Sequence, residues 1–164
     1  MFFKKYSYFQ FLIKSQNQHG LHSPFVYDFI TKGLYQQKIK KSDLLEYKDL
    51  ENLSKKQLVI LTKIVNYFEI NHINFNVNSF IENTNKTYKM LFTKDLSTLI
   101  NVNFKSLNSH HIIIVDQIHQ HKKHKKEWQK IINLQEATVT IDLYYFGLIF
   151  FRKEQVKEHF IIRV

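Results

Sequence analysis

The stretch His111-Ile112-Ile113-Ile114-Val115-Asp116 decides the fold class of this chain. A continuous β-branched run between polar residues is typical of a strand that is buried on both faces, as in parallel sheets covered by helices. Helical patterns precede and follow this strand in the chain. We therefore expect an α/β protein with a sheet built around residues 111–116.

Helical and extended patterns alternate on both sides of this strand. Helices are expected over residues 2–16, 24–37, 54–68, 95–107 and 122–134, and further strands over residues 73–78, 88–92, 138–143 and 148–152. Residues 38–53 are charged and predict a loosely ordered connection with a short helical turn near residues 44–50. We expect an N-terminal helical extension over residues 1–53 and a sheet domain over residues 54–164, together forming a single compact unit.

The first helix carries an aromatic face. Phe2, Tyr6, Phe9 and Ile13 recur at intervals of four, three and four residues, which is the spacing of one face of an amphipathic helix. We expect this helix to pack against the rest of the protein. Lysines interrupt the segment, so it does not predict a signal peptide. No apolar run approaches the ~18–20 residues of a membrane-spanning helix, which predicts no membrane partner and a cytoplasmic location.

Glycine and cysteine are scarce. The 164 residues include three glycines (Gly20, Gly33 and Gly147) and no cysteine. Such widely spaced glycines cannot form the GxGxxG or P-loop turns that hold nucleotide phosphates. The lack of cysteine excludes disulfides, thiolate zinc sites and a cysteine nucleophile.

The chain is strongly basic, with a formal net charge of +10 at pH 7. Such a charge is typical of proteins that bind nucleic acids or anionic surfaces. Only two of the 24 basic residues are arginine, the residue favoured for bidentate phosphate recognition. Lysine is also oversupplied by AT-rich genomes, so both a functional and a compositional origin of the charge remain open.

Three stretches in order along the chain form a recognisable pattern. They are HGLHSPFVY at residues 19–27, IIIVDQIH at residues 112–119, and TVTID at residues 138–142 with FGLIFFRKEQ at 146–155 and KEHF at 157–160. Together they resemble the HGVHSPFVF, DDIH and C-terminal hairpin motifs of a family of class I methyltransferase-like proteins. Members of this family use S-adenosylmethionine (SAM) and are common in Bacteroidetes-type bacteria. The resemblance covers both ends and about half of the chain.

The resemblance implies a truncated Rossmann-like sheet of the class I methyltransferase type, preceded by N-terminal helices. The second and third strands of the family have no counterpart here, so the implied order is 1-4-5-7-6 with strand 7 antiparallel. In the family, a glycine-containing loop after the first strand passes under SAM. Asn76 and Asn78 occupy this position here, without any glycine. We therefore expect SAM, the cofactor that the resemblance implies, not to be bound in the conventional way.

The first motif contains His19, Gly20, His22, Ser23 and Pro24. Ser23 followed by Pro24 is typical of a helix start, because the hydroxyl caps free amides and proline fits the first turn. The two histidines either face the substrate end of a pocket or fix the corner between the first two helices by hydrogen bonds to backbone.

Asp116 and His119 are the candidate catalytic residues. Asp116 ends the expected central strand, at the edge where open α/β sheets place their sites, and His119 follows three residues later. The two side chains either line a vestigial pocket or serve as a strand end and helix cap. Gln117 replaces the second aspartate of the family motif, which weakens a carboxylate-pair role.

Five histidines lie within fifteen residues, and lysines surround them. The histidines are His110, His111, His119, His121 and His124. Imidazoles bind Zn²⁺, Ni²⁺ or Cu²⁺, but the charge of the neighbouring lysines opposes a cation, so we expect no metal site.

The same lysines are the best candidates for binding nucleic acid. Lys122, Lys123, Lys125 and Lys126 lie on one expected helix, and a positive helix can dock on phosphates without reading sequence. Tyr144 and Tyr145 either stack on bases or belong to the core or sheet edge. The simpler interpretation of the lysines is a solvated outer face of a helix that packs Trp128 inward.

These observations leave three functions open. The first is a degenerate methyltransferase-like protein without turnover, acting as a binding or scaffold module. The second is an active methyltransferase on an unidentified substrate, and the third is a basic accessory protein associated with nucleic acid or the ribosome. Loss of two strands would also expose the first strand as an open sheet edge, which either tolerates solvent or is covered by a homo- or hetero-oligomeric partner.

Overall fold

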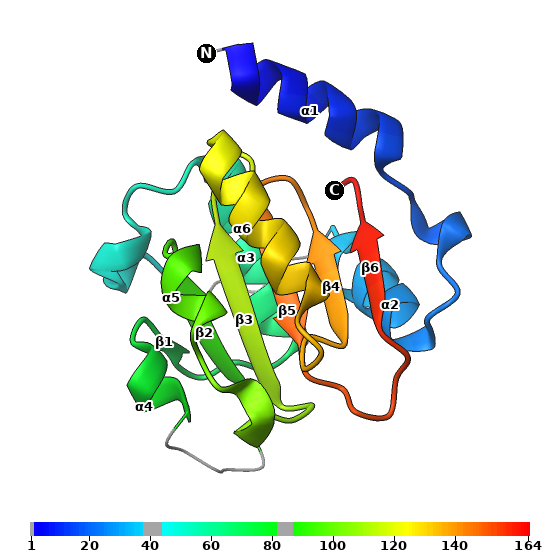
Figure 1. The fold of residues 1–164 in the computed structure, drawn as a ribbon. Helices are drawn as coiled ribbons and strands as arrows, with labels where there is room; N and C mark the ends of the chain where they lie inside the picture. The colour runs from blue at the N-terminus through cyan, green and yellow to red at the C-terminus, as the bar shows by residue number, and fades with distance from the viewer. Residues whose placement is uncertain (1, 38–43, 82–86) are drawn as a thin grey trace. The chain divides into compact units, whose positions relative to one another are not determined.

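In the computed structural model, a six-stranded sheet forms the centre of one of the two units into which the chain divides (Figure 1). The structure describes residues 2–37, 44–81 and 87–164. The sheet unit comprises residues 1–16 and 72–163, and the helical unit comprises residues 17–71 and Val164.

The strands of the sheet run in the order β1-β2-β3-β5-β4-β6. Their bounds are Ile73–Asn74 (β1), Lys89–Thr93 (β2), His111–Asp116 (β3), Val139–Asp142 (β4), Phe146–Phe150 (β5) and Glu158–Ile161 (β6). Strand β5 is antiparallel to its neighbours β3 and β4, and the other pairs of neighbours are parallel. The sequence-based prediction of a mixed α/β protein with an antiparallel strand is therefore confirmed.

Strand β3 is buried along its whole length, as the sequence predicted. All six of its residues are buried. It pairs in parallel with β2 and antiparallel with β5, so both of its edges are hydrogen-bonded. The β-branched run therefore forms an interior strand, as its composition indicates.

Short helices and α6 cover one face of the sheet. Figure 1 shows α5 (Leu96–Ile100) and α6 (Lys122–Asn133) beside each other in front of the strands. Trp128 of α6 points into a buried apolar cluster, as predicted, and Ile131 joins it. The cluster also contains Phe80, Leu91, Leu96, Leu99, Phe104, Leu107, Ile113, Val115, Ile118, Ile132, Ala137, Ile149 and Phe151.

Gly147 allows α6 to approach strand β5 closely. A Cβ atom at this position would lie 2.7 Å from the Cη2 and Cζ3 atoms of the Trp128 ring. Real Cβ contacts are longer than this, so only glycine leaves room for the indole. This glycine lies in the C-terminal stretch that carries the family resemblance.

The strand predicted over residues 73–78 ends much earlier than its alternating pattern indicates. Strand β1 stops at Asn74, and helix α4 (Val77–Ile81) begins three residues later. The Asn76 Oδ1 atom accepts hydrogen bonds from the backbone N–H groups of Asn78 (2.8 Å) and Ser79 (3.4 Å). Asparagine side chains compete in this way with strand pairing, so the prediction of a six-residue strand was wrong.

Two further differences concern the sheet unit. The helix predicted over residues 95–107 is divided into α5 and a 3₁₀ turn, η5 (Phe104–Ser106). Strand β6 was not predicted, because only part of its surface is buried and the apolar alternation is weak. Its pairing with β4 depends on a contact between distant segments rather than on local pattern.

Strand β1 is a very short edge strand. It contributes two residue pairs to β2, and the Asn74 side chain donates a hydrogen bond to the Met90 carbonyl at 3.1 Å. Short edge strands limit pairing with other chains. The open edge expected from the sequence is therefore small.

The first helix, α1 (Phe2–Lys14), belongs to the sheet unit. Its buried residues are Ser7 and Phe11, whereas its periodic aromatic face is exposed. The expectation that the helix packs against the protein is confirmed, but the face that packs is not the aromatic one. The reason is a buried hydrogen bond between Ser7 and His119, described below.

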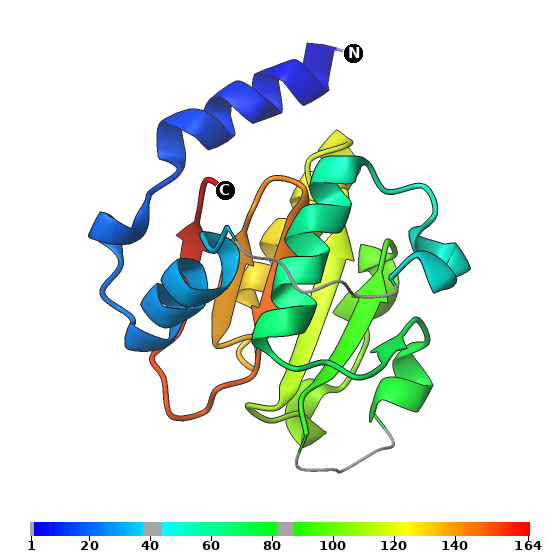
Figure 2. The same cartoon turned by 180° about the vertical axis from the view of Figure 1, so that it is seen from behind.

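The helical unit begins with a 3₁₀ turn, η1 (Gln18–Gly20). Figure 2 shows the chain from the side opposite to that of Figure 1. The helices of this unit are α2 (Pro24–Asp28), which continues as the π-helical segment η2 (Phe29–Leu34), and α3 (Lys55–Tyr67), with 3₁₀ turns η3 (Leu44–Glu46) and η4 (Lys48–Leu50) between them. The Ser23 Oγ atom accepts a hydrogen bond from the Val26 N–H, and Ser54 forms a capping box with Gln57. Both predicted helix starts are thus confirmed, and residues 38–43 of the predicted connection lie outside the described residues.

Candidate functional site

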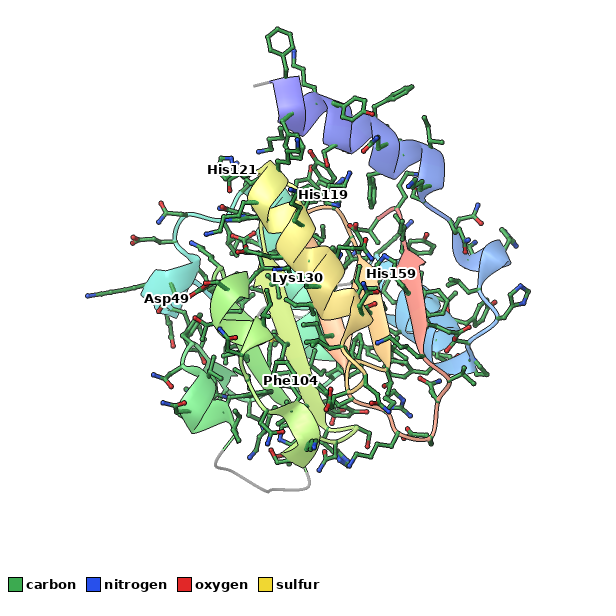
Figure 3. All side chains as sticks on the ribbon, viewed as in Figure 1. Asp49, Phe104, His119, His121, Lys130 and His159 are labelled. Atoms are coloured by element: carbon green, nitrogen blue, oxygen red, sulfur yellow. The ribbon has the colours of Figure 1, made fainter. Side chains whose placement is uncertain are left out.

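Two strands of the sheet unit end in an aspartate at the same edge of the sheet. Both β3 and β4 are antiparallel to β5, so their carboxyl ends, Asp116 and Asp142, lie on the same side. His119 follows β3 after three residues, and Figure 3 shows it at this edge, beneath α1. Open α/β sheets place their ligand sites at this edge.

A buried chain of hydrogen bonds connects α1 to this edge. The Ser7 Oγ atom lies 2.6 Å from His119 Nδ1, and His119 Nε2 lies 2.7 Å from Asp142 Oδ2. The relative exposures of Ser7, His119 and Asp142 are 0%, 7% and 4%. A ring with its hydrogen on Nε2 satisfies both contacts, since it donates to the carboxylate and accepts from the serine hydroxyl.

Tyr144 completes this group, which we call the α1 clamp (Ser7, His119, Asp142 and Tyr144). Its ring stacks on His119 with centroids 5.0 Å apart and an interplanar angle of 17°. Its backbone N–H donates to Asp142 Oδ1 at 2.8 Å, and its hydroxyl donates to the Lys4 carbonyl at 3.1 Å. Burial raises the pKa of the Tyr144 hydroxyl, which therefore stays protonated as a donor.

The backbone is strained at Tyr144 of the clamp and at Gln117, two residues before His119. Tyr144 has φ 69° and Gln117 has φ 62°, in the left-handed region that bulky residues rarely adopt. The Gln117 carbonyl also accepts a hydrogen bond from His124 Nδ1 at 3.1 Å. Such strain persists only where surrounding contacts impose it, and here the clamp and α6 impose it.

The clamp has the residue types of a serine–histidine–aspartate triad but not its arrangement. In hydrolytic triads the carboxylate contacts Nδ1 and the serine contacts Nε2, whereas here the two nitrogens are exchanged. The Ser7 side chain is fully buried beneath its own helix, so a substrate cannot reach its oxygen. The arrangement is suited to holding α1 on the sheet edge.

The polar side chains that follow β1 and β2 act as helix caps. Asn76 caps α4, as described above. The Asp95 Oδ1 atom accepts from the N–H groups of Ser97 (2.9 Å) and Thr98 (3.2 Å) at the start of α5. The hydroxyls of Ser97 and Thr98 also donate to this carboxylate, and these bonds lower its pKa to about 2.

The two candidate catalytic residues are both buried at this edge. Asp116 is the last residue of β3 and faces Phe146 of β5 in the register of the sheet. The ring nitrogens of His119 contact Ser7 and Asp142 rather than Asp116. The structure therefore places both residues where the sequence predicted and gives His119 partners that the sequence did not indicate.

The residues of the HGLHSP motif lie in the helical unit. His19, Gly20 and His22 are exposed, and Ser23 and Pro24 begin α2. The Asn17 Oδ1 atom accepts a hydrogen bond from the His19 backbone N–H at 3.2 Å.

The five clustered histidines are divided between the two ends of β3. His110 and His111 lie at its amino end, where His111 packs against Phe80 with ring centroids 5.3 Å apart. His119 belongs to the clamp, and His121 contacts His124 at the start of α6. Within residues 2–37, 44–81 and 87–164, no group of three or more His, Asp or Glu side chains is arranged to hold a metal ion.

The lysines of α6 differ in their surroundings. Lys122, Lys123 and Lys126 are exposed, whereas Lys125 donates a hydrogen bond to Gln10 of α1 at 2.7 Å. Tyr144 is buried in the clamp, so its ring cannot stack on bases. In the described part of the chain, no helix has the length and apolar character required to span a membrane.

Comparison of the chain with protein-family models, with curated proteins and with solved structures gave no match.

A cavity of about 460 Å³ lies at the opposite edge of the sheet unit. It is next to the start of β4 and the end of β5, with Phe104 (Figure 3), Leu107 and Phe151 among its apolar lining residues and Lys105 and Lys153 among its polar ones. The clamp residues do not line it.

Sequence reasoning missed Ser7, Asp142 and the buried role of Tyr144. Asp142 ends an apolar run in the same way as Asp116, and this parallel was a usable signal. Ser7 is a single small polar residue in an aromatic helix, four residues before Phe11. No local pattern indicates that it contacts a histidine 112 positions away.

Proposed function

We propose that this chain is a methyltransferase-like protein of truncated Rossmann-like architecture that has lost the SAM site and acts without turnover, as a binding or scaffold module. The strand order supports the relationship: β1, β2, β3, β5 and β4 follow one another as strands 1, 4, 5, 7 and 6 of the resemblance would. The antiparallel direction of β5 matches the direction that the resemblance implies for strand 7.

The proposed loss of function rests on the polar side chains at the carboxyl edge of the sheet. These side chains bind other parts of the same chain. Asn76 and Asp95 cap α4 and α5, and His119 with Asp142 holds Ser7 of α1. A SAM site needs close backbone approach after the first strand, which glycine permits. The turn after β1 has no glycine and closes on an asparagine cap. These residues do not fit the cofactor that the resemblance implies.

The first test is isothermal titration of the full chain with SAM and with S-adenosylhomocysteine. We expect no binding at micromolar concentrations. Thermal unfolding gives a second measurement, because a ligand at about 100 times its Kd would stabilise the fold by ~2.7 kcal/mol. Micromolar binding, or a matching rise in Tm, would overturn the proposal in favour of an active methyltransferase.

A variant of α1 distinguishes a SAM site that has been lost from a SAM site that α1 covers. Ser7→Ala removes the hydroxyl that contacts His119 and loosens α1 from the sheet edge. If the site is lost, Ser7→Ala also fails to bind SAM. If the variant binds SAM while the wild type does not, α1 covers a working site, and the proposal of loss is wrong.

A further inference from the structure

Helix α1 has two faces with opposite surroundings. Ser7 and Phe11 are buried on the sheet unit. On the opposite face Phe2, Tyr6, Phe9 and Ile13 are 91%, 60%, 62% and 69% exposed. Contiguous exposed apolar side chains on a folded protein mark an interaction surface. We call these four residues the aromatic face of α1.

The charge of α1 is entirely positive. Lys4, Lys5 and Lys14 are exposed, and the helix contains no acidic residue. Helices that lie in the interface of a bilayer combine an apolar, often aromatic, face with lysines. Their apolar side chains enter the boundary between headgroups and acyl chains, and the lysines contact anionic headgroups.

We propose that α1 binds the surface of an anionic lipid bilayer without spanning it, in contrast to the prediction of no membrane partner made from the lack of a spanning segment. Phe2, Phe9 and Ile13 enter the interface together with Tyr6. Lys5 and Lys14 flank this face and contact the lipid phosphates, whereas Lys4 lies on the side of Ser7 and Phe11. The helix lies in the membrane plane and stays attached to the sheet unit through Ser7 and Phe11. This inference goes beyond the proposed loss of SAM binding and does not depend on it, since no clamp side chain contacts the lipid.

Two other occupants fit the same surface less well. A second copy related by a two-fold axis would bring the lysines of two α1 helices together, without an acidic residue on either helix to pair with them. Nucleic acid would use the lysines, but Ile13 has no ring to stack on bases, and 69% of its surface is exposed. Lipid accounts for both the charge and the apolar face.

The test is flotation of the full chain with phosphatidylcholine vesicles that contain phosphatidylserine, compared with pure phosphatidylcholine. We expect the wild type to bind the anionic vesicles more tightly. Phe2→Ser with Phe9→Ser should lower the partition constant at least ~tenfold, because each phenylalanine loses apolar burial. Val156→Ser, which changes an exposed apolar residue outside α1, is the matched control and should leave binding unchanged.

Charge is tested separately with Lys5→Gln and Lys14→Gln. Each lysine near an anionic membrane contributes ~fivefold to binding, so the double variant should lose ~25-fold at low salt. Lys94→Gln with Lys105→Gln removes the same charge from exposed sites outside α1 and should lose less. Circular dichroism confirms that each variant is folded.

Three results would overturn the proposal. The first is a wild type that does not float with anionic vesicles. The second is flotation that Phe2→Ser with Phe9→Ser does not reduce. The third is a dimer, or a complex with RNA, that the same variant abolishes while vesicle binding is absent.

Discussion

Ser7 and His119, 112 positions apart in the chain, share a buried hydrogen bond of 2.6 Å between the serine Oγ and the imidazole Nδ1. This bond orients α1, because it brings the only buried polar residue of the described helix onto the sheet edge. It also leaves the aromatic face of α1 pointing away from the sheet unit. This contact and the burial of Phe11 together set which side of the helix meets solvent.

The first prediction concerns this contact. Ser7→Ala leaves His119 Nδ1 buried without its partner, so the variant should lose about 1–2 kcal/mol of unfolding free energy. The amides of α1 should also exchange with deuterium faster in this variant than in the wild type, whereas the exchange of the β3 amides should not change. Ser106→Ala, at an exposed serine, is the matched control and should change neither measurement. Unchanged exchange in α1 of Ser7→Ala would contradict a clamping role.

The second prediction concerns the Asp95 cap. Asp95→Ala should destabilise the protein by ~1 kcal/mol, whereas Asp95→Asn should cost less because asparagine also caps well. The folded-state pKa of Asp95 is about 2, against an ordinary value of 3.8. Its stabilisation is therefore complete above pH 3.8 and is lost as the pH falls towards 2. Acid titration of the unfolding free energy should show this loss in the wild type but not in Asp95→Asn.

The third prediction concerns His111, which is buried, and His159, whose surface is exposed on β6. Burial lowers the pKa of His111, with a further contribution from the charge of Lys89, and desolvation by neighbouring atoms lowers the pKa of His159. As the pH falls below the ordinary value of 6.5, the unfolded chain binds protons that the folded chain resists, so stability should decrease.

Denaturant unfolding at a series of pH values tests this prediction. The decrease should be smaller in His159→Gln, which cannot take up the proton in either state. The glutamine can still contact Thr140, whose Oγ1 lies 2.9 Å from His159 Nδ1. His22→Gln, at an exposed histidine, is the control. Equal pH profiles for the wild type and His159→Gln would show that this histidine does not contribute.

The fourth prediction concerns Gly147 and Trp128. Gly147→Ala places a methyl group 2.7 Å from the indole ring and should cost about 1–3 kcal/mol, as overpacking does. Trp128→Phe shortens the ring and removes a buried Nε1 that has no hydrogen-bond partner in the described part of the chain. The cost of Gly147→Ala should therefore be smaller in the Trp128→Phe background. Additive costs in a double-mutant cycle would contradict the close contact.

Several elements could be predicted from local sequence because local interactions form them. The β-branched run of β3 favours a buried strand wherever it pairs, and Ser23 and Ser54 cap helices that begin beside them. Trp128 and Ile131 share the apolar side of a helix whose other positions are largely charged.

Two other elements could not be predicted from the local pattern alone. The alternation after Asn74 fits a strand, but Asn76 satisfies two backbone N–H groups of α4 instead. Strand β6 depends on β4, which precedes it by about fifteen residues and supplies its hydrogen bonds.

The sequence by itself determined that this chain forms a helix-covered sheet, with a glycine-free turn after its first strand and an aromatic periodicity in its first helix. Only the tertiary structure decided that α1 docks through Ser7 and Phe11, and that His119 and Asp142 hold it there. Helical periodicity identifies residues that share a face. Which face is buried depends on partners that the fold brings from distant parts of the chain, and here a buried imidazole and carboxylate required a hydroxyl.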